Sequence, residues 1–232
     1  MTVARRERLL GLLDPGSCDP VALLRRVCEL CIFECSVSGA SMSIGGSGTD
    51  GNQALVHATN ARSVLLEDLQ RTVGEGPGHA ARDTRGPVLV PDLSINLARW
   101  PGYTPGAQAA GAAAVFSFPL QVGAVSLGLL DLHRTSAGSL GRDQLGDVLL
   151  LAEIATHAAL DDLGSVAAMD MARLSDIHAV VHQATGIVSV QLTVSMREAL
   201  VRIRAHAYAN QLPLNEVARQ IVDKRLRLTR GQ

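Results

Sequence analysis

The chain has 232 residues, of which 47% are hydrophobic and only 3% aromatic, and its net charge is −1. This composition predicts a globular protein with a core of aliphatic side chains, and it excludes a disordered chain. No apolar run reaches the roughly 18 uncharged residues of a membrane span, and the first residues lack the pattern of a secretory signal. We therefore expect a cytoplasmic protein with no membrane partner.

The charges are distributed unevenly along the chain. Residues 1–165 contain 12 basic and 17 acidic residues, whereas residues 166–232 contain 9 basic and 5 acidic residues. The basic last part predicts an anionic partner for that part of the chain. A basic surface that only contacts solvent is the simpler alternative.

The first two thirds of the sequence alternate between helical and strand-like patterns. Asp19 and Pro20 predict a helix start, because aspartate caps helix N-termini and proline fits the first turn. The helices expected here span about 20–34 and 62–73, and the second should end at Gly74. The expected strands span about 40–44, 54–59, 87–90, 112–121 and 124–133. This order predicts an α+β domain with an antiparallel sheet flanked by helices.

Two segments between these elements are expected to be irregular. The glycine-rich stretch 74–78 predicts a turn, and it is not a phosphate-binding loop because it follows a helix and lacks a Lys-Ser/Thr ending. Residues 94–106 predict a loop that carries Trp100 and Tyr103.

From about Arg142 the pattern is helical over a long stretch. Apolar residues at Leu174, Ile177 and Val181 continue a three-four spacing past the expected end of the first domain. Such a seam is typical of a coiled coil and predicts a dimeric helical linker. A helix packed only on its own domain is the alternative.

The last 40 residues predict two further helices. Ser195 and Glu198 form a capping box that starts one helix, and Asn210 is expected to end it in the left-handed conformation. Pro213 is expected to start the next helix. Together with the preceding helical stretch, these helices predict an all-α three-helix bundle.

Three cysteines follow one face of the first long helix. A zinc site needs four converging ligands, whereas Cys28, Cys31 and Cys35 share the buried stripe of a helix. Core packing is therefore the favoured interpretation, with a thiol redox role as the alternative.

No set of residues predicts catalysis. The seven histidines form no His-x-x-x-His or His-Glu-x-x-His pair, and Ser41 lacks the glycine two residues on that a nucleophile elbow needs. The sequence therefore predicts no catalytic residues, no metal site and a protein that is not an enzyme.

The C-terminal helices carry residues suited to RNA. Arg197, Arg204 and Tyr208 fall on one side of the first of these helices. Arginine pairs with phosphate and stacks on bases, and tyrosine offers a stacking platform. The candidate RNA-binding residues are Arg197, Arg204, Tyr208, Asn210, Arg219, Lys224 and Arg227. The alternative for them is a basic face that only contacts solvent.

Residues 19–162 contain a set of short motifs: Leu66-Glu67-Asp68-Leu69-Gln70, Gly74-Glu75-Gly76-Pro77-Gly78, Arg85-Gly86-Pro87-Val88, Pro91-Asp92-Leu93, Arg99-Trp100-Pro101 and Phe118-Pro119-Leu120. With these motifs, this part of the chain resembles actinobacterial GAF sensor domains. The resemblance implies a small-molecule pocket, which we expect between the strand with Phe116 and Phe118 and the loop with Trp100 and Tyr103. Gly78 stands where these relatives often have cysteine, so no thiol sensor is expected there. The ligand is not identified, and no cofactor is required.

The C-terminal part contains a second set of motifs: His182-Gln183-Ala184-Thr185-Gly186-Ile187-Val188, Glu198-Ala199-Leu200, Arg204-Ala205, Ala207, Asn210 and Glu216-Val217-Ala218. With these motifs, it resembles the ANTAR domain. ANTAR domains bind paired RNA hairpins and prevent transcription termination. Thr185 departs from the pattern, since lysine is common at that position.

The two resemblances together imply a regulator of the GAF–ANTAR transcription antitermination family. We expect an N-terminal segment (1–18), a GAF sensor domain (19–162), and a linker helix with an ANTAR RNA-binding domain (163–229). The expected partners are RNA hairpins in nascent transcripts, a second copy of the chain and, indirectly, RNA polymerase. The alternatives are a sensor whose helical tail docks on a protein, and a GAF-fold enzyme or redox sensor that uses the cysteines.

Overall fold

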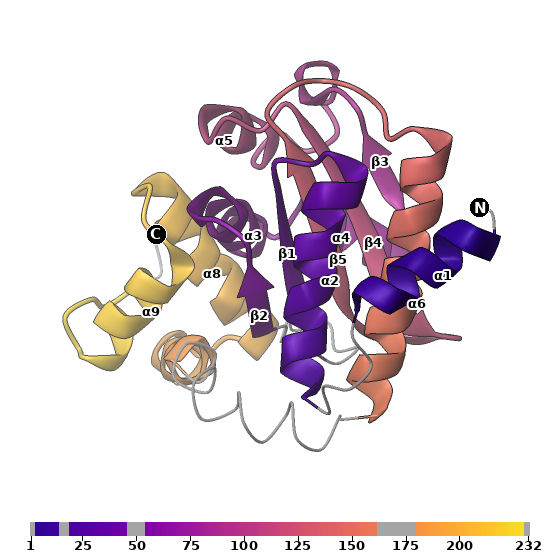
Figure 1. Cartoon of the computed structure of the whole chain (residues 1–232). Coiled ribbons are helices and arrows are strands. Elements are labelled where there is room, and N and C mark those ends of the chain that lie inside the picture. Colours follow the sequence, from indigo (N-terminus) through magenta and orange to yellow (C-terminus); the bar gives the residue numbers. More distant parts are fainter. Residues whose placement is uncertain (1–2, 14–18, 46–53, 162–179, 230–232) are drawn as a thin grey trace.

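The computed structural model describes residues 3–13, 19–45, 54–161 and 180–229 (Figure 1). It shows a five-stranded sheet with helices on both faces and a group of shorter helices beside it. The strands are β1 (Gly39–Ile44), β2 (Ala54–Ala58), β3 (Val88–Val90), β4 (Ala114–Val122) and β5 (Val125–Arg134). They lie in the order β2-β1-β5-β4-β3, and all neighbours are antiparallel. The predicted antiparallel sheet flanked by helices is confirmed.

The helices alternate with these strands along the chain. They are α1 (Val3–Leu12), α2 (Pro20–Cys35), α3 (Ala61–Val73), α4 (Pro77–Thr84), α5 (Thr104–Ala109), α6 (Arg142–Asp161), α8 (Met196–Ala209) and α9 (Leu214–Val222). Residues 180–192 are also helical. None of the helices in the described part of the chain is long and apolar enough to cross a membrane.

Local side chains account for several helix ends. The carboxylate of Asp19 accepts a hydrogen bond from Val21 N at 3.0 Å, and α2 begins there as predicted. Asn60 caps α3 through Ser63 N at 2.9 Å. Gly74 ends α3 with a φ of 74°, the left-handed conformation that glycine adopts without strain.

Three helices were not predicted from the sequence. The expected turn at 74–78 runs into α4, and the expected loop at 94–106 contains α5 and the 3₁₀ turn Leu93–Ile95. Helix α1, at the N-terminus, was not predicted either. These helices have at most ten residues, so they are too short to show a clear apolar periodicity.

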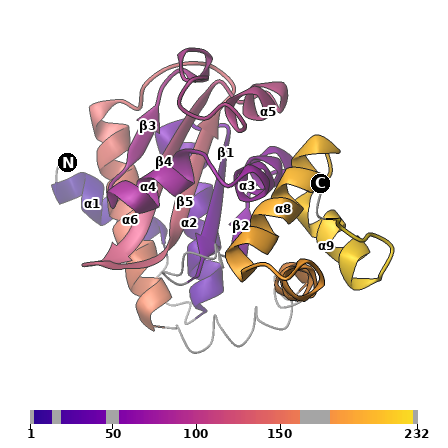
Figure 2. The same cartoon turned by 180° about the vertical axis from the view of Figure 1, so that it is seen from behind.

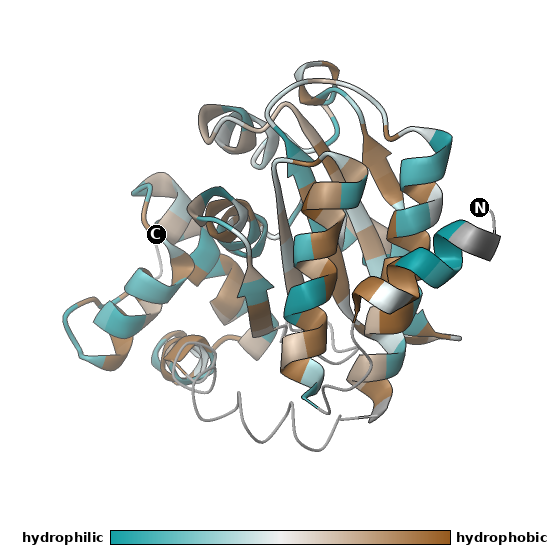
Figure 3. Cartoon of the chain, in the orientation of Figure 1, coloured by the Kyte–Doolittle hydropathy of each residue, from teal (hydrophilic) through white to brown (hydrophobic). Residues whose placement is uncertain are grey.

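Helices α2 and α6 cover one face of the sheet. Alternate strand residues such as Ala40, Met42 and Leu132 point toward these helices, because side chains of a strand alternate between its faces. Figure 3 shows the apolar residues gathered in the central strands. Helix α1 packs beside α6, where the guanidinium of Arg5 forms an ion pair with the buried carboxylate of Asp147.

Helices α3, α4 and α5 cover the opposite face of the sheet, which Figure 2 shows from that side. A second, smaller core lies there. Trp100 and Tyr103 belong to it, and their rings meet edge to face with centroids 6.3 Å apart. The two faces of the sheet therefore bury separate cores.

The C-terminal helices form the predicted three-helix bundle. Residues 180–192, α8 and α9 share a third core that includes Ala184, Ile203 and Val217. The Ser195 hydroxyl accepts a hydrogen bond from Glu198 N at 3.2 Å, so the predicted start of α8 is confirmed. The predicted end differs: Asn210 has a φ of −99°, and Gln211 is the residue in the left-handed region, with a φ of 54°. Asn210 instead donates from its side-chain amide to His206 O at 2.8 Å.

The predicted helical seam lies partly outside the described residues. This holds for Leu174 and Ile177, whereas Val181 is partly buried and packs against the third core of its own chain. Dimerisation through the seam therefore remains a prediction for Leu174 and Ile177.

The bundle packs against the part of the chain that contains the sheet, residues 19–161, which we call the sensor-like part. Helices α8 and α9 lie beside α3 in both Figure 1 and Figure 2. The contact includes a hydrogen bond from Leu214 N to Thr72 Oγ1 at 3.4 Å. The two parts of the chain thus share an interface centred on α3.

Candidate functional site

A row of polar side chains crosses the middle of the sheet. Asp131 on β5 pairs with Ser41 on β1 and with Ser117 on β4. Their neighbours along each strand point to the apolar core under α2 and α6, so these three point to the other face. The sheet therefore presents polar groups to α3 and α4 inside the protein.

A polar cavity of about 10 Å³ lies between this row and α3, which is room for about one water molecule. Glu67 and Gln70 of α3 line it from one side, and His133 and Tyr103 line it as well. Three buried atoms of residues that line it have no hydrogen-bond partner among the described residues: Ser117 Oγ, Asp131 Oδ1 and His133 Nε2. Buried polar atoms are nearly always hydrogen-bonded, so a set of unpaired ones suits a polar ligand or ordered water.

The carboxyl groups of Glu67 and Asp131 lie together in this cavity. Burial, and then the charge of Asp131, raises the pKa of Glu67 to about 7. Burial also raises the pKa of Asp131, although Gln70 Nε2 donates a hydrogen bond to its Oδ2 at 3.1 Å. At neutral pH the pair holds a proton that isolated carboxyl groups would have lost.

The histidine in the cavity is neutral. Burial, and then the positive charge of Arg62, lowers the pKa of His133 to about 4. A neutral imidazole can both donate and accept a hydrogen bond. The cavity thus offers hydroxyl, imidazole and carboxyl groups to a small polar molecule.

Gly78 lies at the edge of this polar region. A Cβ atom there would come within 2.9 Å of Leu129 Cδ1 and 3.2 Å of Asp131 Oδ2. Glycine therefore fits the close approach of α4 to the sheet, where the resembling sequences often have cysteine.

The predicted sensor residues do not form one pocket. Tyr103 lines the polar cavity, and Trp100 packs against Tyr103. Phe116 and Phe118 instead lie in the core under α2 and α6, on the opposite face of the sheet. The prediction placed the aromatic strand residues on the wrong face, because their alternation fixes which residues share a face but not which layer covers that face.

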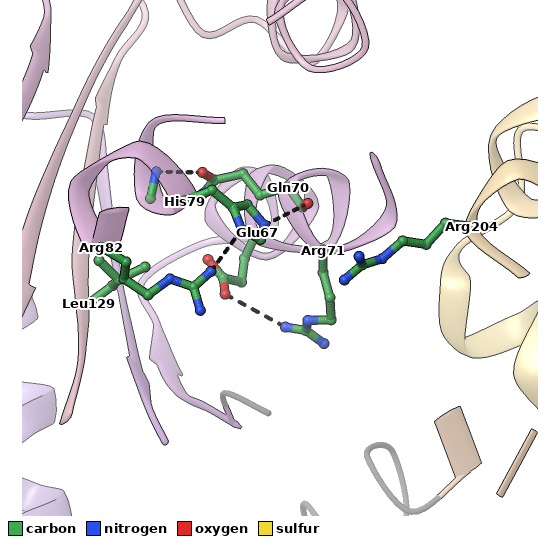
Figure 4. Close-up of a pocket in the computed structure, with 8 residues that line it drawn as sticks. Glu67, Gln70, Arg71, His79, Arg82, Leu129 and Arg204 are labelled. Atoms are coloured by element: carbon green, nitrogen blue, oxygen red, sulfur yellow. Dashed lines mark hydrogen bonds and ion pairs between the residues drawn. The ribbon is translucent and has the colours of Figure 1, made fainter. Parts of the chain in front are cut away.

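A second recess lies between α3, α4 and α8 (Figure 4). Arg82 Nη2 donates to His79 Nδ1 at 3.0 Å, and His79 Nε2 donates to the Gln70 carbonyl at 3.2 Å. Burial lowers the pKa of His79 to about 4, which agrees with this neutral tautomer. Arg71 pairs with Glu67 at 3.7 Å and with Asp68 at 3.5 Å. Arg204 of α8 also lines this recess.

The predicted RNA-binding residues fall into two groups. Arg204 is half-buried against the sensor-like part, and Tyr208 lines a groove between α8 and the loop at Pro101 and Gly102. The remaining predicted residues have exposed side chains: Arg197, Asn210, Arg219, Lys224 and Arg227. The structure thus places Arg204 at the interface with the sensor-like part, whereas Tyr208 is 57% exposed and remains accessible.

Sequence reasoning missed several residues of these sites. Glu67, Asp131 and His133 line the polar cavity, and Arg71 and Arg82 line the recess. A signal for the cavity was present, because serine, aspartate and histidine alternate with apolar residues in β1, β4 and β5. The recess had none, since it joins residues of the consecutive helices α3 and α4 to Arg204 of α8, which lies more than a hundred positions later.

The three cysteines of α2 are buried in the first core. Burial is the main cause that raises the pKa values of Cys28 and Cys35 to about 12, and burial also raises that of Cys31. Thiols held in the protonated form react slowly with oxidants and electrophiles. This arrangement agrees with core packing rather than a redox role.

Comparison with known proteins gives a different match for each of the two parts of the chain. Residues 172–222 match the ANTAR domain family. The chain is similar in fold to a GAF domain of an Acinetobacter phosphoenolpyruvate-protein phosphotransferase, with a TM-score of 0.55, 10% identity and coverage of 71% of this chain and 98% of the other. A GAF domain of such a phosphotransferase from Coxiella burnetii gives a TM-score of 0.52, 14% identity and coverage of 71% and 94%. No curated protein matches the sequence.

A third similar structure, a GAF domain/HD domain protein from Geobacter sulfurreducens, has a TM-score of 0.51, 11% identity and coverage of 65% of this chain and 98% of that one. At these identities the likeness shows the fold alone. The chain therefore combines a GAF-like α+β fold with a C-terminal ANTAR domain.

Proposed function

We propose that this protein is a transcription antitermination regulator, in which the C-terminal bundle binds RNA hairpins and the GAF-like domain senses a small molecule. The observation that carries the proposal is the ANTAR match over residues 172–222, which falls on the basic part of the chain. The proposed division is an N-terminal segment (1–18), a sensor domain (19–162), and a linker helix with the RNA-binding domain (163–229). A regulator of this kind acts on nascent transcripts in the cytoplasm, affects RNA polymerase indirectly and is not an enzyme.

The exposed basic side chains support RNA as the partner. Arg219, Lys224 and Arg227 are exposed on and after α9. Guanidinium and ammonium groups neutralise phosphates and release their counterions, which stabilises binding to RNA. Arg197 offers a further contact at the start of α8.

The polar cavity supports sensing. Its unpaired hydroxyl, carboxyl and imidazole atoms favour a small polar ligand over an apolar one. Such a ligand would contact Glu67 and Gln70 of α3, and α3 also packs against α8 and α9 of the bundle. Binding in the cavity is thereby connected to the RNA-binding helices through one helix.

Transcripts crosslinked to the protein in its native host would identify the RNA. A hairpin pair from such a transcript, placed before a terminator, should give increased readthrough in a purified transcription reaction when the protein is added. The Arg219→Ala/Arg227→Ala variant should lose this effect. Readthrough that is unchanged by the wild-type protein, with and without extracts containing the native ligand, would contradict the proposal. A protein partner for the bundle would then replace RNA.

A further inference from the structure

Three arginines from three helices meet in the recess between the sensor-like part and the bundle. Arg71 comes from α3, Arg82 from α4 and Arg204 from α8 (Figure 4). The recess is partly open to solvent, and its enclosed volume is about 20 Å³. It lies outside the row of polar strand residues, and only its inner wall, with Glu67 and Gln70, is shared with the polar cavity.

The positive charge of Arg204 is not neutralised by the residues around it. Burial, and then the positive charge of Arg82, lowers the pKa of Arg204, and no carboxylate acts on it. Within the described part of the chain, Arg204 has no ion pair, and its Nε is buried without a hydrogen-bond partner. A half-buried guanidinium without a partner is unfavourable, because the desolvation of its buried N–H group is not offset by a hydrogen bond.

The other two arginines are only partly satisfied. Arg71 Nη2 is buried and has no hydrogen-bond partner among the described residues, although it lies 3.7 Å from Glu67 Oε1. Arg71 Nη1 lies 3.5 Å from Asp68 Oδ1. Arg82 donates to a neutral histidine rather than to a carboxylate. The pKa of Glu67 is about 7, so at neutral pH this residue carries only part of a negative charge. The charges of Glu67, Asp131 and Asp83 also act on Arg82. The unbalanced positive charge of the recess is therefore centred on Arg204, beside unused N–H donors.

We propose that this recess binds a small oxyanion of the phosphate type, held by Arg82 and Arg204 with Arg71 at its side. A planar guanidinium presents two parallel N–H groups that match the oxygens of a phosphate. Two guanidinium groups repel each other, and an anion between them attracts both and so offsets this repulsion. The free ion and the phosphate group of a small organic phosphomonoester share this chemistry.

The anion would join the two parts of the chain. Arg204 belongs to the bundle, whereas Arg71 and Arg82 belong to the sensor-like part. A ligand that binds only the docked arrangement stabilises it by mass action. Docking keeps Arg204 away from solvent, so the anion would also compete with RNA; this consequence alone rests on the proposed function.

Thermal unfolding of the full-length protein tests the binding without RNA. Inorganic phosphate should raise Tm by about 5 °C or more at 100 times its Kd, compared with sodium chloride of equal ionic strength. The Arg204→Gln and Arg82→Gln variants should lose this rise. The control is Arg225→Gln, since that side chain is also in the C-terminal part but is 76% exposed, and it should keep the full rise.

Two further measurements keep the test decisive if a glutamine variant unfolds. Arg204→Lys retains the charge but loses the planar pair of donors. Its affinity for phosphate, obtained from the dependence of Tm on phosphate concentration, should therefore be at least tenfold lower than that of the wild type. Hydrogen exchange of the wild type should show phosphate protecting amides of both α3 and α8. The same measurement with glycerol 3-phosphate in place of the free ion shows whether the site binds free phosphate, a phosphomonoester or both. No shift beyond that of chloride, or an equal shift in Arg204→Gln, would overturn the proposal.

Discussion

At the scale of single residues, the unusual groups are the buried ionisable side chains under α3. Glu67 has a pKa of about 7 in the folded protein and about 4.5 as its ordinary value. Between these two pH values the folded state keeps a proton that the unfolded state has lost. The contribution of Glu67 to stability therefore falls as pH rises through this window and stays low above it.

A Glu67→Gln substitution removes this titration. We expect the variant to match the wild type near pH 4.5 and to be more stable above pH 7, by on the order of 1–3 kcal/mol. His79 and His133 titrate with the opposite sign, because their pKa values are lowered to about 4, but they are present in both proteins. Urea unfolding at pH 4.5, 6 and 8 measures the difference. A constant difference at all three pH values would show that Glu67 titrates normally.

The buried thiols give a second prediction at this scale. Cys28, Cys31 and Cys35 should remain unmodified by iodoacetamide in the folded protein at pH 8 and become labelled in denaturant, because burial raises their pKa values. Mass spectrometry of peptides counts the labels at each position. Rapid labelling of any of the three under native conditions would restore the redox interpretation.

At the scale of elements, α8 depends on its first turn. The Ser195 hydroxyl caps this helix by accepting from Glu198 N. Ser195→Ala should lower the free energy of unfolding by about 1 kcal/mol and speed hydrogen exchange in the first turn of α8. Ser195→Asp, which retains an acceptor, is the matched control and should change little. Equal losses in the two variants would assign the effect to something other than the cap.

Elements could be predicted from the sequence where they carry a strong local signal. The sheet strands, α2, α3 and α6 follow from apolar spacing and from caps such as Asp19 and Gly74. Helices α4 and α5 could not be predicted, since they are short and are held by contacts with the sheet and its neighbours rather than by their own pattern. The same limit applies to the sites. The alternation that puts Phe116 and Phe118 on one face cannot say which helices cover that face.

At the scale of the whole molecule, the interface on α3 is the main feature that the sequence did not predict. Arg204 was expected to face RNA, but it faces the sensor-like part in this arrangement. Tyr208 lines a groove beside that part and is 57% exposed. Contacts between residues more than a hundred positions apart, such as Thr72 with Leu214, have no local sequence signal. The docked bundle leaves Arg219 and Arg227 exposed, so RNA could meet these residues first.

Dimerisation belongs to this scale as well. We expect Leu174 and Ile177 to form an intermolecular seam, because they continue a heptad-like spacing beyond the sensor domain. The Leu174→Asp/Ile177→Asp variant should sediment as a folded monomer, since two like charges would be buried at each level of the seam. Val181 is unsuitable for this test, because it packs in its own bundle. A folded variant that remains dimeric would place the interface elsewhere.

The most direct test of the proposed function is the salt dependence of RNA binding by the full-length protein. Binding of the crosslinked hairpin pair, measured by fluorescence anisotropy at increasing salt, should weaken with a slope of about 0.7 to 0.9 logarithmic units for each phosphate neutralised. Arg219→Ala and Arg227→Ala should each reduce that slope by roughly the contribution of one phosphate contact. Binding of hairpin RNA that is absent, or that does not change with salt, would contradict the proposed function.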